Sequence, residues 1–251
     1  MPLVEEPDTA CEETAAQPAL IYSGAGVAPS MDRLEPVSGR WLGYDSGYST
    51  GFVLFDADGT NASGEPITLT NSYNLAASEG TSIGLAADDA GQVLFARYDA
   101  SGAPVLGPLV VANEEPEGLA IAGGSGESLV VWGAGTSLRA RGVDAAGAFA
   151  GEAFDVAQDV VDGPFLASAA FADPGFAVAW TSLLGGDYVT FFATTTTTAA
   201  SSSAVTIVST PTPHWVVKIV RLSDFAYALL FDVQLPTTRP VVLVVDDEGA
   251  P

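Results

Sequence analysis

The first residues that could do chemistry are the acidic ones in GFVLFDADGTNASGE, residues 51–65. Asp56, Asp58, Asn61 and Glu65 carry side-chain oxygens, and a calcium loop binds its ion through several such oxygens at fixed places. The same cluster ends an apolar run, and Asp followed by Gly is typical of a tight hairpin turn. A weak calcium site and a plain turn are therefore the two interpretations of this segment.

Three later stretches repeat the motif, and they favour the turn. Residues 99–102 read DASG, residues 144–147 read DAAG and residues 246–249 read DDEG. The first Asp and the Gly are kept, but the second acidic position becomes Ser101, Ala146 and Glu248. A repeated calcium site would need its ligands in every copy. We therefore predict turns, no metal and no cofactor.

Other reactive residues are few. Asp45, Asp88 and Asp232 each follow an apolar stretch, and paired carboxylates can hydrolyse a glycosidic bond. Acidic residues after a strand are more often solvated, so a glycoside hydrolase is the weakest of the functions considered. His214 is the only His and Cys11 the only Cys. We therefore expect no catalytic triad, no multi-His metal site, no Cys-based zinc site and no disulfide framework.

Aromatic residues at equivalent places form the second candidate site. Tyr44, Trp132, Trp180 and Phe231 each end an apolar stretch, while Ala87 holds the corresponding place in one unit. Aromatic faces at strand ends can stack on sugars, which makes these four residues candidate ligand-binding residues. They can equally pack between neighbouring units, and the apolar runs SLVVW and FAVAW favour packing for the two tryptophans.

These aromatic residues and Ala87 recur at intervals of 43, 45, 48 and 51 residues. The unit reads strand, hairpin turn, strand, Asp/Gly turn, strand, loop, strand, which is an all-β array. In the clearest copy the strands are predicted at 129–132, 137–143 and 149–156, and the segment 164–173 is predicted as the strand that leads into the next unit. One copy is degenerate, because its strand at 188–192 is followed by a Thr- and Ser-rich tract where the Asp/Gly turn should stand.

We predict a single domain over residues 1–251, a five-bladed β-propeller with four antiparallel strands per blade. The repeat landmarks lie near 44–59, 87–102, 132–147, 180–197 and 231–249. The tail DDEGAP joined to the head MPLVEEPDT restores a full unit, so residues 1–25 are expected to complete the last blade, with residues 2–4 pairing with 241–245. A β-sandwich or β-solenoid is the alternative fold.

Composition limits the partners. Acidic residues number 31 against 8 Lys and Arg, a net charge of −23, which argues against binding to nucleic acid or to an anionic membrane surface. No apolar stretch is long enough to span a bilayer, so no membrane insertion is expected. The start lacks the basic and apolar segments of a signal peptide. Few Lys and much Gly, Ser, Thr and Ala suggest an extracellular or cell-surface bacterial protein, with its signal peptide absent from this chain.

Strands that end in Trp and hairpins that read Val-Asp-x-x-Gly resemble those of bacterial secreted β-propeller repeat proteins, and the outline is similar to five-bladed lectins of the tachylectin type. The resemblance covers nearly the whole chain and rests on short motifs. It implies a ring whose faces bind a protein or a glycan. We therefore expect a non-catalytic structural or protein-interaction module, with a carbohydrate-binding propeller as the alternative.

Overall fold

The computed structural model describes residues 33–37, 40–44, 51–56, 58, 67–68, 75–78, 82–158, 160, 166–172, 175–200, 202–234 and 239–250. These residues form β-strands and turns, arranged as five antiparallel sheets that follow one another along the chain. The all-β prediction is confirmed. Within the described residues there is no helix of the length and apolar character needed to cross a membrane.

The strands pair in chain order within each of the first two sheets. The first sheet consists of β1 (Arg33–Val37), β2 (Arg40–Tyr44), β3 (Gly51–Phe55) and β4 (Ile67–Thr68). The second sheet consists of β5 (Leu75–Ser78), β6 (Ser82–Asp89), β7 (Gln92–Asp99) and β8 (Pro104–Ala112).

The third and fourth sheets also have four strands, and the fifth has three among the described residues. The third sheet consists of β9 (Leu119–Gly124), β10 (Glu127–Ala134), β11 (Ser137–Val143) and β12 (Phe154–Ala157). The fourth consists of β13 (Leu166–Ala172), β14 (Gly175–Leu184), β15 (Asp187–Thr195) and β16 (Val205–Thr210). The fifth consists of β17 (His214–Ser223), β18 (Ala226–Val233) and β19 (Arg239–Asp246).

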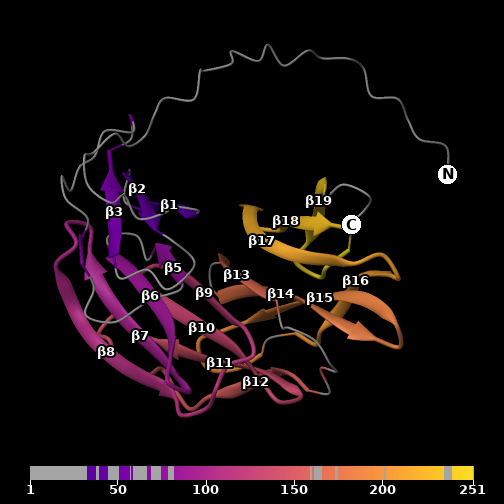
Figure 1. Cartoon of the computed structure of the whole chain (residues 1–251), viewed down its shortest axis with the longest axis horizontal. Helices are drawn as coiled ribbons and strands as arrows, with labels where there is room; N and C mark the ends of the chain where they lie inside the picture. Colours follow the sequence, from indigo (N-terminus) through magenta and orange to yellow (C-terminus); the bar gives the residue numbers. More distant parts are fainter. Residues whose placement is uncertain are drawn as a thin grey trace.

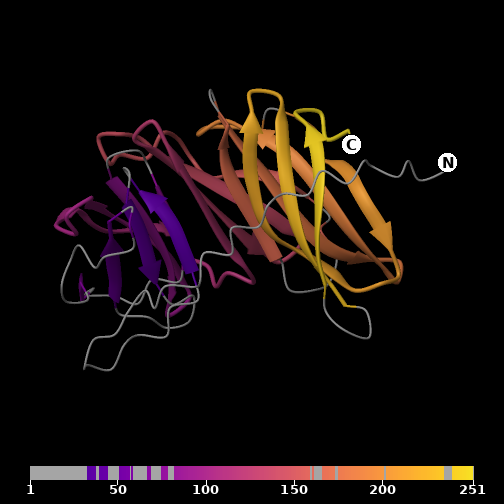
Figure 2. The same cartoon turned by 90° about the horizontal axis from the view of Figure 1, so that it is seen from above.

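The five sheets stand side by side along an arc, in the order of the chain. The first strand of each sheet packs beside the first strand of the next, from β1 through β5, β9 and β13 to β17. Figure 1 shows these strands near the centre and strands such as β8 and β12 toward the rim. The first and fifth sheets stand at the two ends of the arc, and Figure 2 shows them apart from each other.

Both faces of an inner sheet are apolar because successive side chains of a strand point to opposite faces. In β6, Ile83, Leu85 and Ala87 pack with Leu42 and Leu54 of the first sheet. The intervening Ala86, together with Phe95 of β7, packs instead on the third sheet. Each inner sheet therefore needs a neighbouring sheet on either side. This need explains why the sheets stack one after another.

The Asp/Gly motif forms the turn between the third and fourth strands in the second and third sheets, and follows the third strand in the fifth. In the second sheet, Gly102 N–H donates to the Asp99 carbonyl at 2.9 Å, and Ala103 N–H donates to Asp99 Oδ1 at 2.9 Å. Gly102 has a φ of 87°, a left-handed conformation that favours glycine. The turns at Asp144 and Asp246 have the same bonds. The turn prediction is confirmed for these three copies.

The degenerate copy also reverses the chain, with a shorter turn that begins at a different residue. In the fourth sheet, Thr196 N–H donates to the Ala199 carbonyl at 2.8 Å, and Thr196 Oγ1 accepts Ala199 N–H at 3.1 Å. The Thr hydroxyl thus takes the part that the Asp carboxylate has elsewhere, as such hydroxyls do in turns. The Thr-rich tract thus lies where the repeat places its turn, but it is one residue shorter than the Asp/Gly turns, in which Asp99 N–H donates to the Ala103 carbonyl.

These turns also join neighbouring sheets. Arg40 of the first sheet donates to the carbonyl of Ala100 in the second sheet's turn, at 3.2 Å. A Cβ placed on Gly142 of β11 would overlap the main chain of Thr197 in the fourth sheet's turn. A Cβ on Gly249 would likewise meet Val205 of β16. Each of these turns therefore lies against the preceding sheet.

One predicted strand is wrong in its extent. The segment predicted at 149–156 pairs as a strand only over β12, while Phe149 makes an isolated bridge to Val143. The segment between them leaves the ladder, since Ala150 N–H donates to the Gly142 carbonyl and Arg141 Nε donates to the Gly151 carbonyl. An alternation of apolar residues cannot reveal such a local departure from the ladder.

Closure of the ring was predicted from residues 1–25, which lie outside the described residues. Among the residues that the structure describes, the fifth sheet has three strands, and β19 is its last. The expected fourth strand of that sheet stays a prediction.

The close approach of the fourth sheet's turn to β11 gives a test. Gly142→Ala should lower the free energy of unfolding by about 1–3 kcal/mol, because the added methyl group overlaps main-chain atoms that cannot move freely. Gly107→Ala is the matched control, since a Cβ there meets nothing within 4 Å. Denaturant unfolding measures both. Equal stabilities of the two variants would contradict this packing.

Candidate functional site

The structure buries three of the four candidate ligand-binding aromatic residues. Trp132 is 0% exposed, Trp180 1% and Phe231 3%, and each packs with the sheet that precedes its own. This burial is the arrangement that the packing interpretation requires. Tyr44 ends β2, but its side chain lies outside the described residues. A role of the four residues in binding a ligand stays a prediction.

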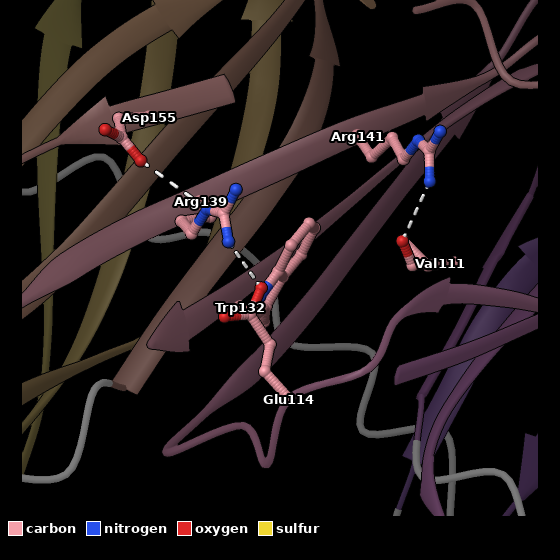
Figure 3. A network of polar contacts seen from close by, with 6 residues as sticks. All are labelled: Val111, Glu114, Trp132, Arg139, Arg141 and Asp155. Atoms are coloured by element: carbon pink, nitrogen blue, oxygen red, sulfur yellow. Dashed lines mark hydrogen bonds and ion pairs between the residues drawn. The ribbon is translucent and has the colours of Figure 1, made fainter. Parts of the chain in front are cut away.

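Trp132 has a polar partner at its buried edge. Its Nε1–H donates to Glu114 Oε1 at 3.0 Å, and Arg139 Nη1 donates to the same oxygen at 2.6 Å (Figure 3). Glu114 belongs to the linker between the second and third sheets, whereas Arg139 is the cross-strand neighbour of Trp132 on β11. The carboxylate thus satisfies the indole and a cation together.

The arginine side chains of β11 cover aromatic rings. The Arg139 guanidinium lies 5.7 Å from the Trp132 ring centroid, and its Nε lies 3.5 Å from Asp155 Oδ1. Arg141 lies 3.7 Å from the centroid of Phe149 and donates to the Val111 carbonyl at 3.1 Å (Figure 3). Cation–π contacts of this kind favour the ring faces. Both cations are held in place by bonds within the chain.

Trp180 occupies the same place in the fourth sheet, but none of the described residues is such a partner. Its cross-strand neighbour is Phe191, whose ring stacks on the indole at 5.4 Å between centroids and 21° between planes. Among the residues that the structure describes, the buried Nε1 of Trp180 has no hydrogen-bond partner, and neither has the buried Oγ of Ser182, two residues further along β14. Such orphan groups are rare in folded proteins, and each calls for an explanation.

A pocket of about 90 Å³ lies beside these two orphan groups. Trp180, Ser182 and Leu184 of β14 line it on one side, with Phe191 of β15. Its remaining walls include Ala157 of β12, at the end of the third sheet. The pocket therefore lies where the third and fourth sheets meet.

His214 is part of a buried chain of hydrogen bonds. Its Nδ1 lies 3.1 Å from the Thr212 carbonyl, which can only accept, so Nδ1 carries the hydrogen. Its Nε2 lies 3.0 Å from Thr190 Oγ1, which in turn lies 2.8 Å from Thr181 Oγ1. Both ring nitrogens are thus occupied, and the residue joins the fourth and fifth sheets.

Two of the four candidate calcium ligands belong to the described residues. Asp56 forms an ion pair with Arg40 at 3.1 Å, and Asp58 is exposed, while Asn61 and Glu65 lie outside the described residues. Over the described part of the chain, no three His, Cys, Asp or Glu side chains gather as a metal site would need. The calcium interpretation of this loop stays a prediction.

Asp88 and Asp232 are described, and Asp45 is not. Partial burial raises the pKa of Asp88, and the nearby carboxylates of Glu115 and Asp89 raise it further. Asp88 lies in the second sheet and Asp232 in the fifth, so the two carboxylates belong to opposite parts of the arc.

Sequence patterns could not have found Glu114, Ser182 or the Thr190–His214 pair. Glu114 lies 18 residues before Trp132 and outside any strand, and it belongs to none of the repeated motifs. Trp132 and Trp180 differ in their cross-strand neighbours, which are Arg139 and Phe191. These neighbours can be identified only when the register of the strands is known.

Comparison with known proteins reveals likeness in fold alone. No protein family matches the chain, and no curated protein matches it either. A quinonprotein alcohol dehydrogenase-like protein from Bacteroides thetaiotaomicron superposes with a TM-score of 0.52 and 10% identity, over 91% of this chain and 56% of that one. A nidogen/laminin complex (TM-score 0.47, 9% identity, 84% and 76% covered) and apo AztD from Citrobacter koseri (0.42, 9%, 87% and 70%) are more distant.

These structures have propeller-type folds. The superposition on the Bacteroides protein, together with the five successive antiparallel sheets, gives this chain a propeller-like, all-β architecture. The chain spans little more than half of that protein.

The buried tryptophans supply a prediction. Trp132→Phe should destabilise the protein more than Trp180→Phe, because only the first change removes an N–H that donates to a carboxylate, that of Glu114. Trp→Ala at either position should cost about 3–5 kcal/mol, as expected for a large buried ring. Thermal unfolding, with binding to a glycan array measured in parallel, checks both. Near-native stability with lost glycan binding would contradict the packing role.

The buried hydrogen bonds of His214 supply a second prediction. Thr190→Val should cost about 1–3 kcal/mol, because His214 Nε2 then stays buried without its donor. Thr206→Val, on the exposed part of β16, is the control and should change stability by less than about 0.5 kcal/mol. Chemical denaturation distinguishes the two variants, and a similar midpoint for both would show that the bond contributes nothing.

Proposed function

We propose that this chain is a non-catalytic, five-bladed propeller that serves as a structural or protein-interaction module. The observation that carries the proposal is that four polar side chains at the contacts between strands and sheets are bonded within the chain. His214, Arg139, Arg141 and Glu114 are all bonded within the chain, and their bonds hold strands or sheets together. Side chains so engaged stabilise a scaffold rather than turn over a substrate.

Closure of the ring is supported by the exposed face of the fifth sheet. Register places Val220, Ala228 and Val244 in one row and Lys218, Leu230 and Val242 in the next. Val242 is 61% exposed, and Val220 and Val244 are about half exposed. In the second, third and fourth sheets both faces are packed against neighbours. This face fits a further sheet.

The chain's own first sheet is the occupant we propose. Its Trp41 is 43% exposed and lies on the face opposite Leu42, which packs on the second sheet. The two ends of the arc thus each carry exposed apolar groups. Residues 2–4, outside the described residues, would add the fourth strand beside β19, so that a strand from each end of the chain joins one sheet.

The test compares two equally exposed valines. Val242→Asp should lower the melting temperature by several degrees, because closure would bury this side chain, and deleting residues 1–7 should do the same. Val105→Asp, at a position 60% exposed on β8, should change it little. The wild-type protein should sediment as a monomer.

The other occupants give different results. A wild-type dimer that Val242→Asp converts to monomer would place a second copy on this face. A monomer in which Val242→Asp and Val105→Asp have the same small effect would leave the face open for a separate protein. Either result contradicts closure by the first sheet.

A further inference from the structure

The pocket beside Trp180 is distinct from the scaffold contacts described above. In the equivalent place of the third sheet, Glu114 and Arg139 occupy the edge and face of Trp132. In the fourth sheet Phe191 replaces the arginine, and no acceptor for the indole N–H is found in the described part of the chain. At the same position of the repeat, the indole of Trp132 is bonded to a carboxylate, whereas the indole of Trp180 has no such partner among the described residues.

We propose that this pocket binds a small neutral molecule, or the end group of a larger one, through a carbonyl or hydroxyl oxygen. The indole N–H of Trp180 can only donate, so its partner must be an acceptor. The Ser182 hydroxyl can donate or accept, and lies on the same face of β14. Phe191 and Leu184 offer apolar walls to the remainder of the ligand.

The size of the pocket and the charge around it narrow the class of ligand that it can bind. The pocket of about 90 Å³ is smaller than the ~150 Å³ cavity that holds the six carbons of benzene, so a group of about four non-hydrogen atoms fits. An anion is disfavoured because Gln158, on the rim, is bonded to the carboxylate of Asp155 at 2.8 Å, and the whole chain carries −23. A purely apolar ligand would leave both buried polar groups unsatisfied.

The chain contains four tryptophans, so labelled protein gives four indole N–H signals, which Trp→Phe variants assign. N-methylacetamide, whose acetamide portion has a carbonyl acceptor and about four non-hydrogen atoms, is the probe. It should shift the Trp180 signal saturably, with a dissociation constant on the order of millimolar. The Trp132 signal is the internal control and should not move, since its N–H is already bonded to Glu114.

Variants and competing probes make the test specific. Ser182→Ala should weaken binding about five- to tenfold by removing one polar partner, and Ser182→Val should abolish it by filling the pocket. Acetate, similar in size but charged, should not bind. A shift that does not saturate, that all four signals share, or that survives Ser182→Val would overturn the proposal, as would a pocket that holds only water and ignores the probe.

Asp159 provides a last check. It stands two residues after β12, as Glu114 stands two residues after β8, and it lies outside the described residues. Should Asp159→Ala alone move the Trp180 signal, its carboxylate would be the acceptor and the proposal would be wrong. An unmoved signal in Asp159→Ala, with N-methylacetamide binding retained, supports the pocket as a ligand site.

Discussion

The packing of each sheet on its two neighbours is the constraint on which the rest of the structure depends. A strand such as β6 places apolar side chains on both faces, so a single sheet of this chain cannot be stable in water. Neighbouring sheets remove these faces from water, and the repeated unit supplies one sheet after another. The turns then need only to reverse the chain without spoiling that contact.

The turns satisfy this need through one oxygen each. In Asp99 the carboxylate accepts the Ser101 hydroxyl at 2.6 Å and two main-chain N–H groups, and these bonds, the Ser101 hydroxyl first, lower its pKa. The stability that the turn gains from the ionised carboxylate is therefore present above the ordinary pKa of Asp, and is lost as the pH falls through the lowered pKa. Thr196 provides its oxygen without ionisation, so the fourth sheet's turn has no such dependence on pH.

The sequence predicted well those features that repeat along the chain. Alternating apolar residues and Asp/Gly turns located the units, and even the Thr-rich tract was assigned to the correct position in its unit. The extent of β12 and the partner of Trp132 could not be predicted in this way. Both depend on groups brought together by folding, namely Gly142 with Ala150 and a linker carboxylate with a strand indole. Periodicity describes which face a residue occupies, but it carries no information about the atom at the end of its side chain.

The same limit explains why two equivalent tryptophans differ. Trp132 and Trp180 occupy one position of the repeat and are equally buried, so their contribution to sheet packing is the same in kind. Their polar edges are free to diverge, because the linker and the cross-strand residue that reach the indole N–H are not constrained by the packing of apolar faces. A repeat architecture of this type fixes the rings and leaves their hydrogen-bonding edges variable. In such an architecture a binding function can arise in one unit without disturbing the others.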